Sequence, residues 1–153
     1  MTQDTDQSGD TVRLTRTLDA RRETVWEAWT DPAELGVWYG PDGASVDVLE
    51  YDLRPGGRRV ITMHVEAPSG PMSMTFAGEF REVEEPSRLV YTEAHADENG
   101  TPAGPETVVQ LELHELGERT TLELTHHGIP AGSPGEAGWV MALGHLETRL
   151  SVG

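Results

Sequence analysis

The segment from Ser133 to Leu150 constrains this fold most, because its pattern predicts a helix with a single apolar face. Trp139, Leu143, Leu146 and Leu150 recur at spacings of three or four residues and therefore lie on one narrow stripe. Such a helix is stable in water mainly when another apolar surface covers its stripe. The rest of the chain is expected to supply that surface.

The start of this helix is marked by three residues. Ser133 is followed by Pro134 at the first helical position and by Glu136 three residues on. A hydroxyl and a carboxylate at this spacing accept hydrogen bonds from backbone amides that the first helical turn leaves unpaired. The helix is therefore predicted to begin at Pro134, with Ser133 as its cap.

The residues before this helix read as short strands separated by turns. Over residues 72–81, apolar side chains alternate with mostly polar ones, a period of two that is typical of a strand with one buried face. Shorter patterns of the same kind, bounded by turn residues, predict six further strands at residues 11–18, 46–53, 58–65, 88–95, 107–116 and 120–127.

Two short helices are expected between the first two strands. Val25 and Trp29 share one helical face, and Pro32 ends the first helix because proline disfavours helix at the residue before it. A second helix over residues 33–38 has Asp31 as its cap. The predicted order is one strand, two short helices, six strands and a long helix, which indicates an α+β fold with a sheet wrapping one helix.

The length and the absence of Cys limit what the chain can be. Its 153 residues are enough for one core, so we expect one domain over residues 11–153 after a disordered acidic tail at residues 1–10. Without Cys there are no disulfides and no thiolate metal sites. The N-terminus has neither a signal peptide nor an apolar span, which makes a cytoplasmic location the default expectation.

The charge of the chain argues against two classes of partner. The net charge is −16 and all eleven basic residues are Arg, a composition unsuited to binding nucleic acid or an anionic membrane. The acidity either keeps the protein soluble or reflects adaptation to high salt. An exposed strand edge would allow a homodimer, although the sequence does not fix the oligomeric state.

A series of motifs runs through the chain. They are Val25-Trp26-Glu27-Ala28-Trp29-Thr30-Asp31-Pro32 with Leu35, Trp38 and Gly40-Pro41; Asp52-Leu53-Arg54-Pro55-Gly56-Gly57; Gly78-Glu79-Phe80 with Pro86-Ser87-Arg88-Leu89-Val90; Thr125-His126-His127-Gly128; and Gly138-Trp139. In this order they resemble the START-like (SRPBCC) superfamily, and within it the branch named after the activator of the heat-shock chaperone (Hsp90) ATPase. The resemblance extends from about Val12 to Leu150.

The resemblance implies a helix-grip fold, in which a bent antiparallel sheet of about seven strands closes around the C-terminal helix and leaves a cavity. Superfamily members bind lipids, sterols, polyketides or other apolar molecules, and some catalyse cyclisation, dehydration or ring hydroxylation. The namesake activator engages its chaperone through an additional N-terminal domain, for which this sequence shows no counterpart. An interaction with a chaperone is therefore not expected.

If the helix does not fill the concave side of the sheet, the inward side chains line a cavity for an apolar ligand. The candidate ligand-binding residues are Trp38, Met63, Met74, Phe76, Tyr91, Leu111, Trp139 and Leu143. Thioethers repack readily around a guest, and tyrosine adds a polar contact to an apolar wall. The alternative is that these side chains pack solidly against one another and leave no space.

The sequence predicts neither a metal site nor a cofactor, because the six His residues show no metal-ligand spacing and no cofactor motif is present. His126 and His127 are neighbours on a strand and point to opposite faces. A His, Glu93 or Glu112 directed into an apolar cavity would be suited to acid–base catalysis. No catalytic residue is assigned.

The leading hypothesis is a small-molecule binding protein with an internal hydrophobic cavity for a lipid-, polyketide- or aromatic-like ligand. One alternative is a cyclase- or dehydratase-type enzyme that uses the same cavity by general acid–base catalysis. The other is a co-regulator of a chaperone ATPase.

Overall fold

The computed structural model describes residues 10–151, where the chain forms seven strands and three helices. The elements are, in order, β1 (Thr11–Leu18), α1 (Arg22–Thr30), α2 (Pro32–Trp38), β2 (Ser45–Tyr51), β3 (Arg58–Ala67), β4 (Gly70–Glu84), β5 (Arg88–Ala96), β6 (Thr107–Leu116), β7 (Arg119–His127) and α3 (Pro134–Ser151). This order confirms the α+β fold predicted from the sequence. Apart from Asp10, the expected acidic tail lies outside the described residues.

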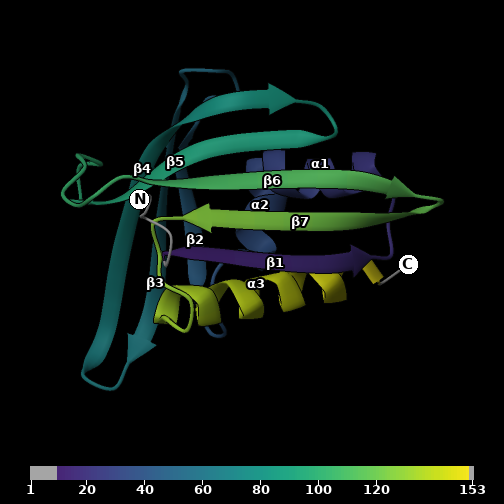
Figure 1. The fold of residues 1–153 in the computed structure, drawn as a ribbon. Coiled ribbons are helices and arrows are strands. Elements are labelled where there is room, and N and C mark those ends of the chain that lie inside the picture. Colours follow the sequence, from purple (N-terminus) through teal and green to yellow (C-terminus); the bar gives the residue numbers. More distant parts are fainter. Residues whose placement is uncertain (1–9, 152–153) are drawn as a thin grey trace, which may run out of the picture.

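The seven strands form one antiparallel sheet in the order β1-β7-β6-β5-β4-β3-β2. β2 to β7 follow one another as a meander, and β1 pairs with the free side of β7, from Thr11 opposite His127 to Leu18 opposite Thr120. Figure 1 shows that the sheet is strongly bent, because β3 and the first part of β4 run at a steep angle to β6, β7 and β1, and β4 itself curves towards them. The C-terminal helix α3 packs against β1 and α2, as expected for a helix-grip fold.

Two register shifts contribute to the bend. One lies at Leu49 in β2 and the other at Arg81 in β4, where in each case one strand has an extra residue. An extra residue of this kind kinks its strand and increases the local twist. β4 is also longer than the predicted 72–81, so it continues on both sides of Arg81.

A close approach of β4 to β5 accompanies the bend. A Cβ atom at Gly78 would lie 1.8 Å from the carbonyl oxygen of Thr92, so a larger residue does not fit without moving the backbone. Beside it, the Glu79 amide donates to the Thr92 hydroxyl at 3.0 Å. Gly78 therefore lets the two strands cross closely at the point where the sheet turns.

The helix signals found in the sequence have the expected hydrogen bonds. The Asp31 carboxylate accepts from the Ala33 amide at 3.0 Å and caps α2. At the start of α3, the Ser133 hydroxyl accepts from the Glu136 amide at 3.4 Å, and the Glu136 carboxylate accepts from the Gly132 amide at 2.6 Å. Among residues 10–151, no helix combines the length and the apolar character that crossing a membrane requires.

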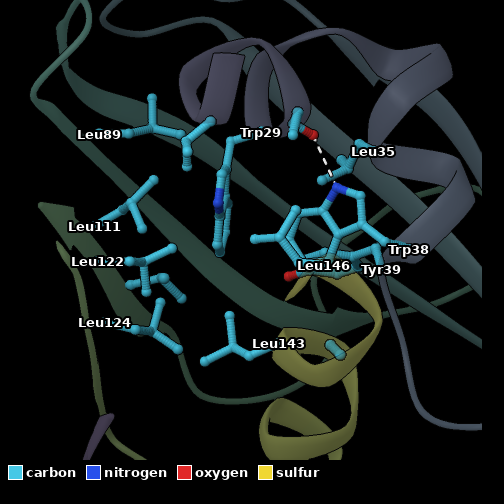
Figure 2. Close-up of a cluster of buried hydrophobic side chains, with 14 of the residues drawn as sticks. Trp29, Leu35, Trp38, Tyr39, Leu89, Leu111, Leu122, Leu124, Leu143 and Leu146 are labelled. Carbon is cyan, nitrogen blue, oxygen red and sulfur yellow. Dashed lines mark hydrogen bonds between the residues drawn. The ribbon is translucent and has the colours of Figure 1, made fainter. Parts of the chain in front are cut away.

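The core is a cluster of aromatic and leucine side chains enclosed by the sheet and the three helices (Figure 2). The Trp29 ring lies at 4.8 Å from Trp38 and 6.0 Å from Trp139, measured between centroids. The Trp38 indole donates to the Ala28 carbonyl at 3.0 Å, the dashed line in Figure 2. α3 buries its predicted stripe here, through Trp139, Leu143 and Leu146 together with Ala142.

Replacing Gly78 by alanine tests the role of the close approach. The added methyl group would collide with the Thr92 carbonyl, and relief requires the two strands to separate. We expect Gly78→Ala to lower the free energy of unfolding, measured by urea denaturation, by about 3 kcal/mol or more.

Gly144→Ala in α3 is the matched control, because a Cβ atom at Gly144 meets no atom within 4 Å. Alanine is favoured over glycine inside a helix by up to about 1 kcal/mol, so this variant should be at least as stable as the parent. Equal unfolding midpoints for the two variants would contradict the role assigned to Gly78.

Candidate functional site

A cavity of about 470 Å³ lies between the N-terminal half of α3, the loop after α2 and strands β3 to β7. This volume is within the range of small-molecule sites, which is about 300–1,000 Å³. Its larger apolar side chains are Met63, Met74, Phe76, Ile129 and Trp139, and Ala94, Ala142 and several Gly and Pro residues lie between them. Its polar side chains are Tyr39, Glu93, His95, Thr107 and His126.

The Glu93 carboxylate in this wall is held by a buried arginine. Nη1 of Arg59 donates to Oε2 of Glu93 at 3.2 Å, and the two side chains are 1% and 11% exposed. The guanidinium also lies on the Tyr91 ring, with Cζ 3.8 Å from the ring centroid. In the described part of the chain, Nε and Nη2 of Arg59 have no hydrogen-bond partner, so the carboxylate and the ring are the main stabilising contacts of this charge.

Tyr39 brings a second polar group to the same end of the cavity. Its hydroxyl lies 3.2 Å from the Tyr91 hydroxyl, and its ring centroid lies 5.4 Å from Cζ of Arg59. Burial, and next to it the negative charge of Glu93, raises the pKa of Tyr39 to about 12. Burial likewise raises the pKa of Tyr91 well above its ordinary value. Both hydroxyls therefore keep their protons at neutral pH.

His126 is held in one tautomer by a chain of hydrogen bonds. The Trp139 indole N–H donates to Nδ1 of His126 at 2.9 Å, so the ring proton is on Nε2. Nε2 donates to the Thr107 hydroxyl at 2.8 Å, and this hydroxyl donates to the Glu93 carbonyl at 2.7 Å. Burial lowers the pKa of His126, in agreement with the neutral ring that these bonds require.

The structure divides the eight candidate ligand-binding residues into two groups. Those in the wall of the cavity are Met63, Met74, Phe76 and Trp139. Those in the packed core, each at most 1% exposed, are Trp38, Tyr91, Leu111 and Leu143. The second group lies where α1 and the residues after α2 fill the concave side of the sheet with the Trp29 and Tyr39 rings. A ligand-binding role for the wall residues stays a prediction.

Sequence reasoning did not predict the buried ion pair, although a signal for it exists. In β3, Arg59 lies two positions before Ile61 and four before Met63, and in β5, Glu93 lies two positions after Tyr91. Residues separated by an even number of positions share one face of a strand. Alternation therefore places one cation and one anion on the inward face of two strands. A charge at an inward position needs a partner, which is the pattern of a buried pair.

A second group of titratable side chains lies on the outer face of the sheet. Atoms of Glu112, His114 and Glu123 that could bind a metal lie within 4.8 Å of one another. Glu112 and His114 are two residues apart on β6, and Glu123 is opposite Glu112 on β7, which explains their common face. Arg88 forms an ion pair with Glu112, so this group is a surface network of charged contacts.

His126 makes the stability of the protein depend on pH. Because its pKa is lowered, the folded protein binds this proton more weakly than the unfolded chain does. The corresponding stability is complete above the unfolded pKa of about 6.5 and is lost as the pH falls below it. One proton changes the free energy of unfolding by at most about 1.4 kcal/mol per pH unit. We expect His126→Gln to remove this pH dependence from free energies of unfolding measured between about pH 7.5 and pH 5.

His127→Gln is the matched control for the loss of one imidazole. His127 lies on the opposite face of β7, where Nε2 is 3.1 Å from Oε1 of Gln110. If the slope against pH decreases by the same amount in both variants, the assignment to His126 is wrong.

Comparison with known proteins agrees with this architecture. The family model of the Activator of Hsp90 ATPase homolog 1-like proteins (AHSA1) matches residues 19–151. No curated protein gives a significant match. Protein CV1439 from Chromobacterium violaceum is a solved structure with 28% sequence identity and a TM-score of 0.81, and the match covers 94% of this chain and 99% of that one.

Two further solved structures are similar. Protein NE0264 from Nitrosomonas europaea has 27% identity and a TM-score of 0.76, with 94% of this chain and 96% of that chain covered. DynU16, described as a protein in the dynemicin biosynthetic locus, has 27% identity and a TM-score of 0.67; the match covers 94% of this chain and 48% of DynU16. The family model agrees with the bent seven-stranded sheet and the terminal helix. The chain therefore belongs to the Activator of Hsp90 ATPase homolog 1-like family of the START-like superfamily.

Proposed function

We propose that the protein binds an apolar small molecule in the cavity between α3 and the bent sheet. The observation that carries the proposal is the cavity of about 470 Å³ with its mainly apolar wall. Apolar surface removed from water contributes about 25 cal/mol per Å². A molecule that fills much of this space would bind with micromolar affinity after the costs of association.

The side of α3 that faces the cavity supports this proposal. Its lining positions include Gly135, Gly138 and Ala142, which are too small to fill the space between helix and sheet. A Cβ atom at Gly138 would meet no atom within 4 Å. On the opposite wall, Met63 and Met74 have flexible side chains that adapt to a guest. START-like folds are a ligand-binding type of domain, and the place of DynU16 in a biosynthetic locus is in line with this.

A second candidate function is acid–base catalysis in the same cavity. It is favoured by one observation, a carboxylate and an imidazole that both belong to the wall, Glu93 and His126. Against it, both nitrogens of His126 are already hydrogen-bonded to Trp139 and Thr107, and Glu93 is paired with Arg59. A compound recovered unchanged after incubation with the protein supports binding, whereas its conversion supports catalysis.

Filling the cavity from α3 tests the binding function. Gly138→Phe directs a ring towards the cavity from a position where the Cβ atom meets nothing within 4 Å, and it also removes a helical glycine, so the protein should stay folded. We expect the parent to bind the neutral probe N-phenyl-1-naphthylamine saturably at micromolar concentration in a fluorescence titration. The affinity of Gly138→Phe should be lower by about tenfold or more.

Gly144→Phe is the matched control, since Gly144 lies on the same helix, has free space around its Cβ position and is not part of the cavity wall. It should bind the probe as the parent does. The proposed function is wrong if the parent shows no saturable binding, or if the two phenylalanine variants bind the probe equally well.

A further inference from the structure

We propose that the ligand of this cavity carries a neutral hydroxyl group, as an alcohol or a phenol does, and that Glu93 and Tyr39 bind this group. The inference rests on the proposed binding function and specifies the chemical class of its ligand. A carboxylate of the same shape is expected to bind more weakly.

Glu93 offers a hydrogen-bond acceptor that the protein does not use. Oε2 accepts from Arg59, whereas Oε1 has no donor within residues 10–151. The side chain belongs to the cavity wall and keeps 11% of its surface exposed. Oε1 is therefore an acceptor that still reaches solvent, and a ligand hydroxyl can supply a donor to it.

Tyr39 supplies the complementary donor. Tyr39 belongs to the wall, and the one hydrogen-bond partner of its hydroxyl within residues 10–151 is the Tyr91 hydroxyl. When the Tyr91 hydroxyl is the donor in this bond, the Tyr39 proton is free for a ligand. The raised pKa of Tyr39, about 12, keeps the proton on this oxygen. A ligand hydroxyl can donate to Glu93 and accept from Tyr39, whereas a carboxylate can only accept.

The charges at this end of the cavity disfavour an anion. The guanidinium of Arg59 is balanced by Glu93 and covered by the Tyr91 ring. A ligand carboxylate would therefore place a second negative charge near Glu93, whose side chain is largely shielded from solvent. The net charge of −16 also repels a negatively charged ligand at longer range.

The remaining polar side chains of the wall do not compete for the ligand. His126 uses both ring nitrogens, and the Thr107 hydroxyl accepts from His126 and donates to a backbone carbonyl. His95 is exposed, and its ring lies against Phe76 at 4.8 Å between centroids. Among the buried polar side chains of the wall within residues 10–151, Glu93 and Tyr39 are thus the ones with unused hydrogen-bonding capacity.

Three compounds with the same ring system test the inference. Naphthalene, 2-naphthol and 2-naphthoate are compared at about pH 7 by their displacement of N-phenyl-1-naphthylamine from the parent protein. Because a hydrogen bond to a charged acceptor contributes about tenfold or more in affinity, 2-naphthol should bind at least about tenfold more tightly than 2-naphthoate. Naphthalene, which tests the cavity alone, should also displace the probe.

A substitution at Glu93 should reverse this preference. Glu93→Gln keeps the size of the side chain but leaves the buried charge of Arg59 without a carboxylate partner. A ligand carboxylate can then take the place of the lost charge, so 2-naphthoate should bind more tightly than to the parent and 2-naphthol more weakly. Glu79→Gln is the matched control, because it makes the same charge change at an exposed site outside the cavity.

The possible results separate the two proposals. If naphthalene binds but 2-naphthol and 2-naphthoate bind equally well to the parent, the hydroxyl preference is overturned and the binding function stands. If the probe binds but none of the three compounds displaces it, the hydroxyl inference fails and the binding function stands. If the probe itself does not bind saturably, both proposals fail. The comparison on the parent protein decides the matter even when Glu93→Gln does not fold. An equal change of preference in Glu79→Gln and Glu93→Gln would also overturn the assignment to Glu93.

Discussion

The close approach of β4 to β5 at Gly78 is the constraint on which the rest of the structure depends. The missing side chain lets the Thr92 carbonyl come within a distance that any Cβ atom would block. Gly78 is also paired with Arg59 across β3 and β4, so the close approach lies next to the strand position of the buried charge. One glycine thus permits the close crossing of β4 and β5 at the bend of the sheet.

The bend creates a concave side that the protein fills unevenly. Around Trp29, the rings and leucines of the core pack without leaving a site for a guest. Towards the N-terminal half of α3, small residues such as Gly138 and Ala142 face the sheet, and a cavity remains. Large side chains on the facing part of the helix would have closed it. The cavity is therefore a consequence of residue size along one helix, combined with the curvature of the sheet.

The polar end of the cavity is difficult to explain as a stabilising feature. A buried pair such as Arg59 and Glu93 contributes little net stability, because removing two charges from water offsets most of their attraction. The pair nonetheless fixes a carboxylate in an otherwise apolar wall, and His126 is fixed beside it by Trp139 and Thr107. A few fixed polar groups in a mainly apolar wall are typical of a small-molecule site.

The sequence by itself determined the order of the elements and, for most of them, the inward face; β4 departs from its alternation at exposed Met72 and buried Ala77. Alternation in β4 and the cap formed by Ser133 and Glu136 depend on neighbouring residues, so they are visible in the chain alone. Only the tertiary structure decided which inward side chains pack solidly and which border the cavity. Met74 and Tyr91 follow the same inward pattern, yet Met74 faces the cavity while Tyr91 is covered by Tyr39 and Arg59. The difference depends on the space between elements that are distant in sequence, and local patterns do not encode that space.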